Sequence, residues 1–212
     1  MKIEKIKLAV FDFDSTLMDG ETLEYLAKEF NIEKEMKTIT QKAMRGEIDF
    51  FESLIKRVKL LEGLDIKKVN EICHNLPLVK GAKEVIDYLR KNKIKVLCFS
   101  GGFKNALEYY KKELKLDGEF SNILHQRDGK LTGLVGGEMM FSTSKGDVLK
   151  NLQDILEVTE AQTLVCGDGA NDLSMFKYSE NKIAFCAKPI LQKACDYNIK
   201  EKDLNKIIEL FD

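Results

Sequence analysis

The stretch Lys7-Leu-Ala-Val-Phe-Asp-Phe-Asp-Ser-Thr-Leu17 decides how this chain folds. It begins as a near-continuous apolar run, which is typical of a strand that helices cover on both faces. The apolar run ends at two carboxylates, Asp12 and Asp14. Such carboxylates cost free energy unless they bind a cation or take part in catalysis, although a pair of turn-forming residues is the alternative on this stretch alone. We expect the central strand of a sheet, with a functional site at its carboxyl end.

Three further apolar runs have the same character, at Ile94–Phe99, Thr163–Cys166 and Ile183–Cys186. Helical patterns such as Ala82–Lys91 and Lys145–Leu156 precede or follow them. This alternation predicts an α/β fold with a doubly wound, mainly parallel sheet. Because parallel strands end at the same edge of a sheet, polar residues that follow them are expected to lie together there.

Two segments interrupt the alternation. The first, residues 19–77, contains only charged amphipathic helix patterns, with an apolar stripe at helical spacing made of Phe51, Leu54, Ile55, Val58 and Leu61. We expect it to form a small inserted helical cap on a core domain of residues 1–18 and 78–212. The second, Ile123–Val135, alternates around Asp128-Gly129 and predicts a β-hairpin.

The composition excludes several classes of protein. The chain has 212 residues, 44% hydrophobic and 33% charged, which excludes a disordered or fibrous protein. Its 34 Lys and Arg against 35 Asp and Glu leave a net charge of −1, so nucleic acid and anionic membrane are not expected partners. We see neither a signal peptide nor a membrane span, and we expect a cytoplasmic protein.

The cysteines imply no cross-links. They number five, form no Cys-x-x-Cys pair and are expected to be small buried apolar residues, at Cys73, Cys98, Cys166, Cys186 and Cys195. None is followed six residues later by arginine, which disfavours a cysteine-nucleophile phosphatase. With only His74 and His125 present, a histidine-based phosphatase and a zinc enzyme are also disfavoured.

A second acidic motif, Gly167-Asp-Gly-Ala-Asn-Asp172, follows the run that ends at Cys166. It nearly matches a dinucleotide fingerprint, but Asp172 replaces the last glycine and would place a negative charge against a pyrophosphate. Alone, the motif fits an ordinary turn equally well. Together with Asp12 and Asp14 it forms an all-oxygen acidic cluster, which suits a hard cation such as Mg²⁺.

Two further features give weaker signals. Ser100-Gly-Gly102 ends a strand and precedes a helix that begins near Phe103, where backbone N–H groups and a hydroxyl can hold an anion, although a plain turn fits as well. Lys145 begins the helix after the hairpin, and a lone lysine is nearly always on the solvated surface. The significance of both depends on the motifs around them.

Taken together, these motifs resemble those of the haloacid dehalogenase superfamily of phosphatases, in the same order: Asp12-Phe-Asp-Ser-Thr16, Ser100-Gly-Gly102, Lys145 and Gly167-Asp-Gly-Ala-Asn-Asp172. With a helical insertion directly after the first motif, the chain most closely resembles the phosphoserine phosphatases of this superfamily. The resemblance extends from Lys7 to about Phe211. It implies a Rossmann-like core and hydrolysis of O-phospho-L-serine to L-serine and phosphate, the last step of serine biosynthesis.

The resemblance also implies a role for each motif. Asp12 would be the nucleophile that forms an aspartyl-phosphate, and Asp14 the general acid and then the base. Mg²⁺ would be held by the Asp12 carboxylate, the Asp14 main-chain carbonyl and the Asp168 carboxylate, with Asp172 in support. The other phosphoryl oxygens would be held by Ser100, Gly101, Gly102 and Lys145, with Asn171 orienting Lys145 or the phosphate.

In the cap, the resemblance implies that the substrate is selected by Glu21, Met44, Phe50 and Arg57. Glu21 would bind the substrate ammonium and Arg57 its carboxylate. Phe50 and Arg57 lie seven residues apart, about 20° from eclipsed on a helix, so they can face a cavity together. Most Glu and Arg side chains in so charged a chain are solvated, so these assignments depend on the resemblance.

Some questions stay open at this stage. The motifs indicate phosphoryl transfer without specifying the alcohol, so another small phosphomonoester is one alternative substrate. A receiver-like signalling domain with a phosphorylated Asp is a second alternative, which Asp14 and the helical insertion disfavour. Glu138–Ser144 matches the family least well, and monomer and homodimer are equally compatible with the sequence. With eleven residues before the first motif, we expect no N-terminal regulatory domain.

Overall fold

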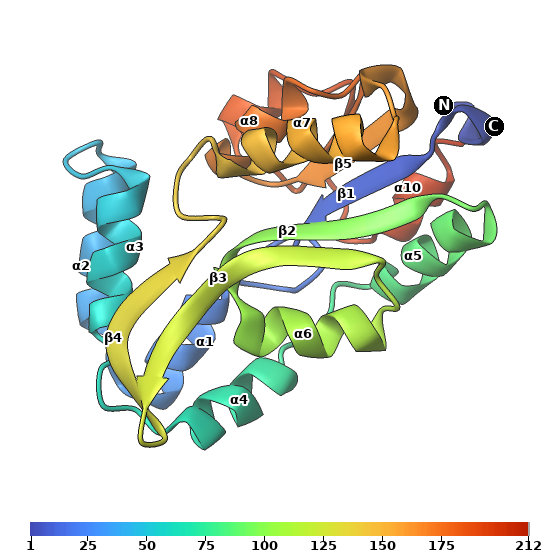
Figure 1. The fold of residues 1–212 in the computed structure, drawn as a ribbon. Helices are drawn as coiled ribbons and strands as arrows, with labels where there is room; N and C mark the ends of the chain where they lie inside the picture. Colours follow the sequence, from blue (N-terminus) through green and yellow to red (C-terminus); the bar gives the residue numbers. More distant parts are fainter. Residues whose placement is uncertain (212) are drawn as a thin grey trace.

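The strand β1 (Leu8–Asp12) is buried along its whole length and lies in the middle of a seven-stranded sheet. The computed structural model, which describes residues 1–211, orders the strands β4-β3-β2-β1-β5-β6-β7 (Figure 1). Neighbouring strands are parallel except β3 and β4, which form an antiparallel pair, so the predicted mainly parallel sheet is confirmed. The other strands are β2 (Lys95–Phe103), β3 (Gly118–Arg127), β4 (Lys130–Gly137), β5 (Thr163–Gly167), β6 (Asn181–Phe185) and β7 (Tyr197–Ile199).

Helices cover both faces of this sheet. Leu8 and Val10 of β1 share an apolar cluster with residues of α7, α8 and α9, whereas Ala9 and Phe11 share one with α5, α6 and α10. Because side chains alternate along a strand, Asp12 continues the face of Leu8 and Val10, toward α7. The helices are α5 (Ala82–Lys91), α6 (Lys104–Glu113), α7 (Ser144–Leu156), α8 (Leu173–Phe176), α9 (Pro189–Gln192) and α10 (Asn205–Ile208), and the 3-10 turns are η1 (Ile3–Lys5), η2 (Glu160–Gln162) and η3 (Ala170–Asp172).

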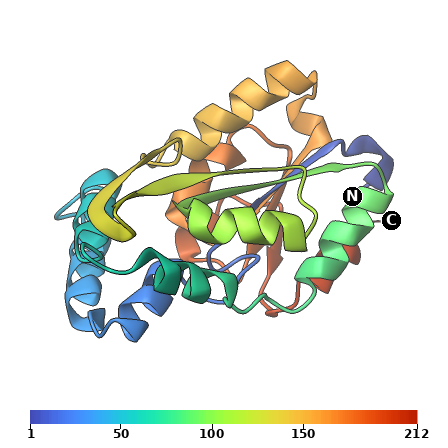
Figure 2. The same ribbon diagram turned by 60° about the horizontal axis from the view of Figure 1, so that its bottom comes forward.

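Four helices, here called the inserted helices, lie between β1 and α5 in the chain. They are α1 (Thr22–Glu29), α2 (Glu33–Met44), α3 (Phe50–Lys59) and α4 (Ile66–His74). Figures 1 and 2 place α2 and α3 at the end of the molecule toward which β1 points. The chain leaves and re-enters the core at one place, because the Asp19 N–H donates to Pro77 O (2.8 Å) and the Val79 N–H donates to Leu17 O (2.9 Å).

The hairpin of β3 and β4 is joined to the inserted helices. Its turn has positive φ at Asp128 (51°) and Gly129 (77°), as a tight two-residue turn requires. The segment between α3 and α4 pairs with this tip: the Gly63 N–H donates to Leu131 O (2.8 Å) and the Ile66 N–H donates to Gly129 O (2.9 Å). The hairpin therefore supports the far end of the inserted helices.

The structure differs from the sequence expectations in three places. Phe51 is 39% exposed, so the apolar stripe of α3 begins at Leu54. Cys186 is exposed, because it follows the last residue of β6 with a positive φ of 44°, where the chain leaves the sheet, and Cys195 is only half-buried. The sequence analysis predicted none of the short elements β7, α8, α9 and α10, because they have too few residues for a recognisable period. Among residues 1–211, no helix combines the length and the apolar character that a membrane crossing needs.

Candidate active site

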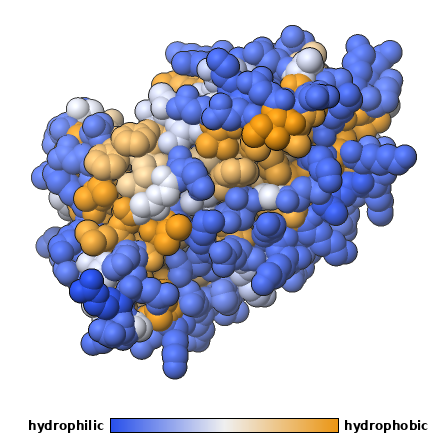
Figure 3. Space-filling model, in the orientation of Figure 1, coloured by the Kyte–Doolittle hydropathy of each residue, from blue (hydrophilic) through white to orange (hydrophobic). Residues whose placement is uncertain are grey.

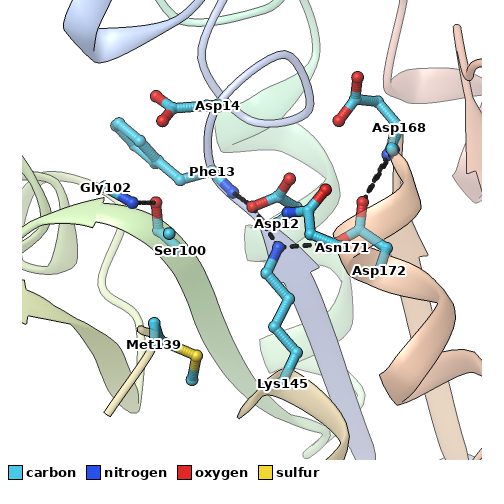
Figure 4. Close-up of polar contacts among 12 residues, drawn as sticks. Asp12, Phe13, Asp14, Ser100, Gly102, Met139, Lys145, Asp168, Asn171 and Asp172 are labelled. Carbon is cyan, nitrogen blue, oxygen red and sulfur yellow. Dashed lines mark hydrogen bonds and ion pairs between the residues drawn. The ribbon is translucent and has the colours of Figure 1, made fainter. Parts of the chain in front are cut away.

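Asp12 is the last residue of β1 and is 3% exposed. Its Oδ1 accepts hydrogen bonds from Lys145 Nζ (2.6 Å) and from the Phe13 N–H (2.7 Å), as Figure 4 shows. Among the described residues both contacts fall on Oδ1, which leaves Oδ2 as the oxygen available for attack. The carboxylate is thus held in one orientation by two charge-assisted contacts.

Lys145 is the second residue of α7 and, against the usual behaviour of lysine, is only 3% exposed. Its Nζ also lies 2.6 Å from Asp172 Oδ1, so it joins two carboxylates. Burial alone would lower its pKa, but Asp12 and Asp172 raise the pKa above the ordinary value and keep the ammonium charged. The next residue, Gly146, lets α7 pack against the main chain of Ser174, because a Cβ there would lie 2.5 Å from Ser174 O.

Asp168 and Asp172 come from the loop after β5. Asp172 folds back over this loop, where its Oδ2 accepts the N–H groups of Asp168 (3.0 Å) and Gly169 (2.9 Å). A Cβ at Gly167 would lie 2.4 Å from this oxygen, so the first glycine of the motif is needed for packing. Burial and the charge of Asp172 raise the pKa of Asp168 to about 6, and Lys188 Nζ lies 3.9 Å from its Oδ2.

These side chains form a buried acidic cluster. Oxygen atoms of Asp12, Asp168 and Asp172 all lie within 4.8 Å of one another. Burial and the neighbouring Asp172 raise the pKa of Asp12 well above its ordinary value, and the charge of Lys145 opposes this shift only in part. An all-oxygen donor set with surplus negative charge fits a hard divalent cation such as Mg²⁺.

Asp14 lies beyond the end of β1, so the alternation of a strand does not orient it. A turn with positive φ at Ser15 (59°) follows it, and its Oδ1 accepts both the N–H (3.1 Å) and the hydroxyl (2.6 Å) of Thr22. Burial raises its pKa, which favours the protonated form that a general acid needs. Thr22 was not singled out from the sequence, where its only signal is a small polar residue at the start of a helix.

The Ser100-Gly-Gly102 segment passes close to Asp14. Ser100 is fully buried, and its Oγ accepts the Gly102 N–H (2.9 Å). A Cβ at Gly102 would lie 3.2 Å from Asp14 Oδ2, and one at Gly101 would lie 3.3 Å from the ring of Phe50. Glycine at both positions therefore lets this segment pass between a core carboxylate and an inserted helix.

A buried amide fastens this segment to the exit of the hairpin. Asn122 of β3 donates from Nδ2 to Gly101 O and to Met139 O (both 3.1 Å), and its Oδ1 accepts the Met139 N–H (3.0 Å). This network explains how the segment Glu138–Ser144, which matched the family least well, is held. Asparagine is depleted in strands, and its place inside a strand pattern is the one sequence signal for this role of Asn122.

The inserted helices bring two charged side chains toward Asp14. Glu21, the residue before α1, accepts the Ser15 hydroxyl (3.1 Å), and burial followed by the charge of Asp14 raises its pKa to about 7. Arg57 is half-buried; burial lowers its pKa, while the charges of Glu21 and Asp14 oppose that shift. Glu21 and Arg57 thus lie within electrostatic reach of each other and of the site.

The remaining predicted residues are placed differently from one another. Asn171 comes from η3, and its side chain lies beside Asp12 in Figure 4. Met44, at the end of α2, is 77% exposed and is not brought against the other site residues. Its assignment stays a prediction.

The chain matches the model of the haloacid dehalogenase-like hydrolases over residues 6–179 and belongs to that family. It is similar to proteins named phosphoserine phosphatase: 53% identical over 96% of this chain and 98% of the protein from Wolinella succinogenes, and 44% over 97% and 98% for Methanocaldococcus jannaschii. The fold is similar to a solved phospho-aspartyl intermediate analogue of phosphoserine phosphatase, with a TM-score of 0.91 and 43% identity over 98% of this chain and 99% of that one. A substrate-bound phosphoserine phosphatase complex superposes with the same TM-score of 0.91.

Proposed function

We propose that this protein is a phosphoserine phosphatase, which hydrolyses O-phospho-L-serine to L-serine and phosphate. The observation that carries the proposal is the geometry of Asp12, whose Oδ1 is held by Lys145 and a main-chain N–H while Oδ2 is available. Relatives that are 44–53% identical over almost the whole chain carry the name of this activity.

Asp12 and Asp14 divide the chemistry. Asp12 Oδ2 attacks the phosphorus atom in line, a P–O bond to Asp12 forms, and the bond to the serine oxygen breaks. Asp14 donates its proton to that leaving oxygen and then accepts a proton from the water that hydrolyses the aspartyl-phosphate. The raised pKa of Asp14 supports the first role, and the hydrogen bonds from Thr22 hold its other oxygen in place.

The phosphoryl group needs donors for its remaining oxygens. Lys145 supplies a buried ammonium, and the segment Ser100, Gly101 and Gly102 supplies a hydroxyl and backbone N–H groups. We assign to Asn171 the orientation of Lys145 or of the phosphate. Asn122 holds Gly101 through its main-chain oxygen, and Asp172 holds the ammonium of Lys145.

The surplus of carboxylates supports a Mg²⁺ site. The Asp12 carboxylate, the Asp14 main-chain carbonyl and the Asp168 carboxylate would hold the ion, with Asp172 in support through Lys145 and the loop N–H groups. When bound there, the ion would neutralise charge and so let an anionic nucleophile approach an anionic phosphate. The family membership agrees with this cofactor.

Selection of the alcohol belongs to the inserted helices in this proposal. Residues 19–77 form the cap and residues 1–18 with 78–212 the core, a division that the hydrogen bonds joining the two chain crossings support. Glu21 binds the substrate ammonium, Arg57 binds its carboxylate, and the ring of Phe50 bounds the site beside Gly101. Met44, which is 77% exposed, stays a prediction from the sequence. The cytoplasmic location and the choice between monomer and homodimer stay predictions.

Phosphate release from a panel of substrates tests the proposal. With Mg²⁺ present, kcat/KM for phosphoserine should exceed that for phosphothreonine, phosphoethanolamine and sugar phosphates. If a sugar phosphate or another monoester is the better substrate, the reaction class stands and the substrate assignment is wrong. If no monoester is hydrolysed, the receiver-like alternative replaces the enzyme.

A further inference from the structure

The two ends of α3 are attached to the core in different ways. Just beyond its C-terminal end, backbone hydrogen bonds join Gly63 and Ile66 to the tip of the hairpin. At its N-terminal end the attachment is made by side chains: the ring of Phe50 lies over Gly101, and the ring of Phe51 stacks on Phe141. Interactions of side chains at a surface release more easily than a backbone ladder, so this end is the one suited to open.

The stacked pair lies on the rim of the site rather than inside it. The centroids of Phe51 and Phe141 are 5.2 Å apart with planes 9° from parallel, a favourable offset geometry. The rings are 39% and 59% exposed, so they are reached by solvent and do not belong to the apolar core. Figure 3 shows apolar surface on this face over α3 and β4.

The core partner is held in place before the rings meet. The Phe141 N–H donates to Ser144 Oγ (3.1 Å) and the Ser144 N–H donates to Phe141 O, in the turn that opens α7 one residue before Lys145. Two residues earlier, Asn122 binds both main-chain groups of Met139. The backbone of Phe141 is therefore held in place. The stack positions the N-terminal end of α3 relative to α7, the helix that carries Lys145.

We propose that Phe51 and Phe141 form an aromatic latch that holds α3 closed against the Ser100-Gly-Gly102 segment of the active site. Closing the latch brings the neighbouring Phe50 onto Gly101, and opening it lets substrate enter and product leave. Neither ring touches the reacting atoms, so both are positioning residues. The kinetic test of the latch rests on the proposed function. The closure of the latch can also be observed without turnover.

Kinetics on four proteins provide the first arm of the test: wild type, Phe51→Ala, Phe141→Ala and the double variant. Each single variant should raise KM for phosphoserine about 3- to 10-fold, the effect expected from losing an aromatic pair, with kcat within about twofold. The KM of the double variant should not exceed that of the single variant with the higher KM, because each change already breaks the same contact. Phe51→Tyr keeps the ring and should restore the wild-type KM. Leu134→Ala, which removes an apolar side chain 60% exposed on β4, is the matched control and should leave KM unchanged.

Fluorescence provides the second arm, because the chain contains no tryptophan. Phe141→Trp introduces a single fluorophore into the latch. Its emission should change on addition of Mg²⁺ with phosphoserine, or with beryllium fluoride as a phosphoryl mimic, and Phe51→Ala in the same background should abolish that change. Additive kinetic effects, a failure of Phe51→Tyr to rescue, an equal loss in Leu134→Ala, or an emission change that survives Phe51→Ala would overturn the latch. If wild type does not hydrolyse phosphoserine, the proposed function fails, and the beryllium fluoride signal still decides on the latch.

Discussion

The core half of the site and the inserted helices hold their side chains in different ways. Asp12, Lys145 and Asp172 are at most 3% exposed, and each makes at least two hydrogen bonds or ion pairs. In contrast, among residues 1–211 Glu21 accepts one hydrogen bond, from Ser15, and Arg57 makes a single long one (3.3 Å) to its own helix. Groups that react need one fixed geometry, whereas groups that recognise a ligand can complete their bonds when it binds. Changes in the core should therefore affect the chemistry, and changes in the inserted helices should affect the choice of substrate.

Replacing Asp12 should have the largest effect. Asp12→Asn keeps the shape but removes the nucleophilic charge, and kcat should fall on the order of 10⁴-fold or more. Rapid acid quenching of wild type with labelled substrate should trap an acyl phosphate that hydroxylamine cleaves. Asp154→Asn, an exposed change on α7, is the control and should leave kcat unchanged. Label on a serine or histidine would show that a different residue is the nucleophile.

Removing divalent metal should silence the protein almost as completely. The carboxylates of the buried cluster then repel one another and the phosphate, so activity should disappear in chelator and return with Mg²⁺. Ca²⁺ should support turnover poorly because its coordination is larger and looser. Mg²⁺ should also raise the Tm of wild type in the absence of substrate. Full activity after exhaustive metal removal would contradict the site.

Truncating Arg57 should have a smaller effect that depends on the substrate. A charge-assisted hydrogen bond contributes about 1.5–3 kcal/mol, so Arg57→Ala should lower kcat/KM for phosphoserine roughly 10- to 150-fold. Phosphoethanolamine lacks the carboxylate, so it should be a poor substrate of wild type and change much less in the variant. Arg45→Ala, an exposed arginine paired with Glu47, is the matched control. An equal loss on both substrates would mean that Arg57 holds the phosphate or the inserted helices instead.

Neutralising Glu21 should weaken binding of the substrate ammonium, and in the metal-free protein it should also change stability in a way that depends on pH. A carboxyl whose pKa rises from 4.5 to about 7 on folding binds its proton more tightly in the folded state. Its contribution to stability is therefore present below pH 4.5 and is lost as the pH rises toward 7. In metal-free protein, Glu21→Gln should gain on the order of 1–3 kcal/mol over wild type at pH 8 and much less at pH 5 in urea unfolding. Glu33→Gln, an exposed change in the first turn of α2, should show no such difference between the two pH values.

Local pattern was sufficient for the residues that lie on regular elements or in short motifs. β1 and its Asp12 follow from a continuous apolar run, and α5 from its helical period. The tight turn at Asp128-Gly129 follows from residues that tolerate positive φ. In each case the determining contacts are made within a few residues, so the sequence itself contains the information.

The sequence alone therefore determined the parallel sheet, the family motifs and the acidic character of the site. Only the tertiary structure decided which distant groups hold those motifs: Thr22 on Asp14, Asn122 between Gly101 and Met139, and the stacking of Phe51 on Phe141. The physical reason is that a hydrogen bond or ring contact between residues far apart depends on where whole helices and strands pack. A single side chain in the sequence, whether a threonine, an asparagine or an exposed phenylalanine, has no local period that reveals its partner.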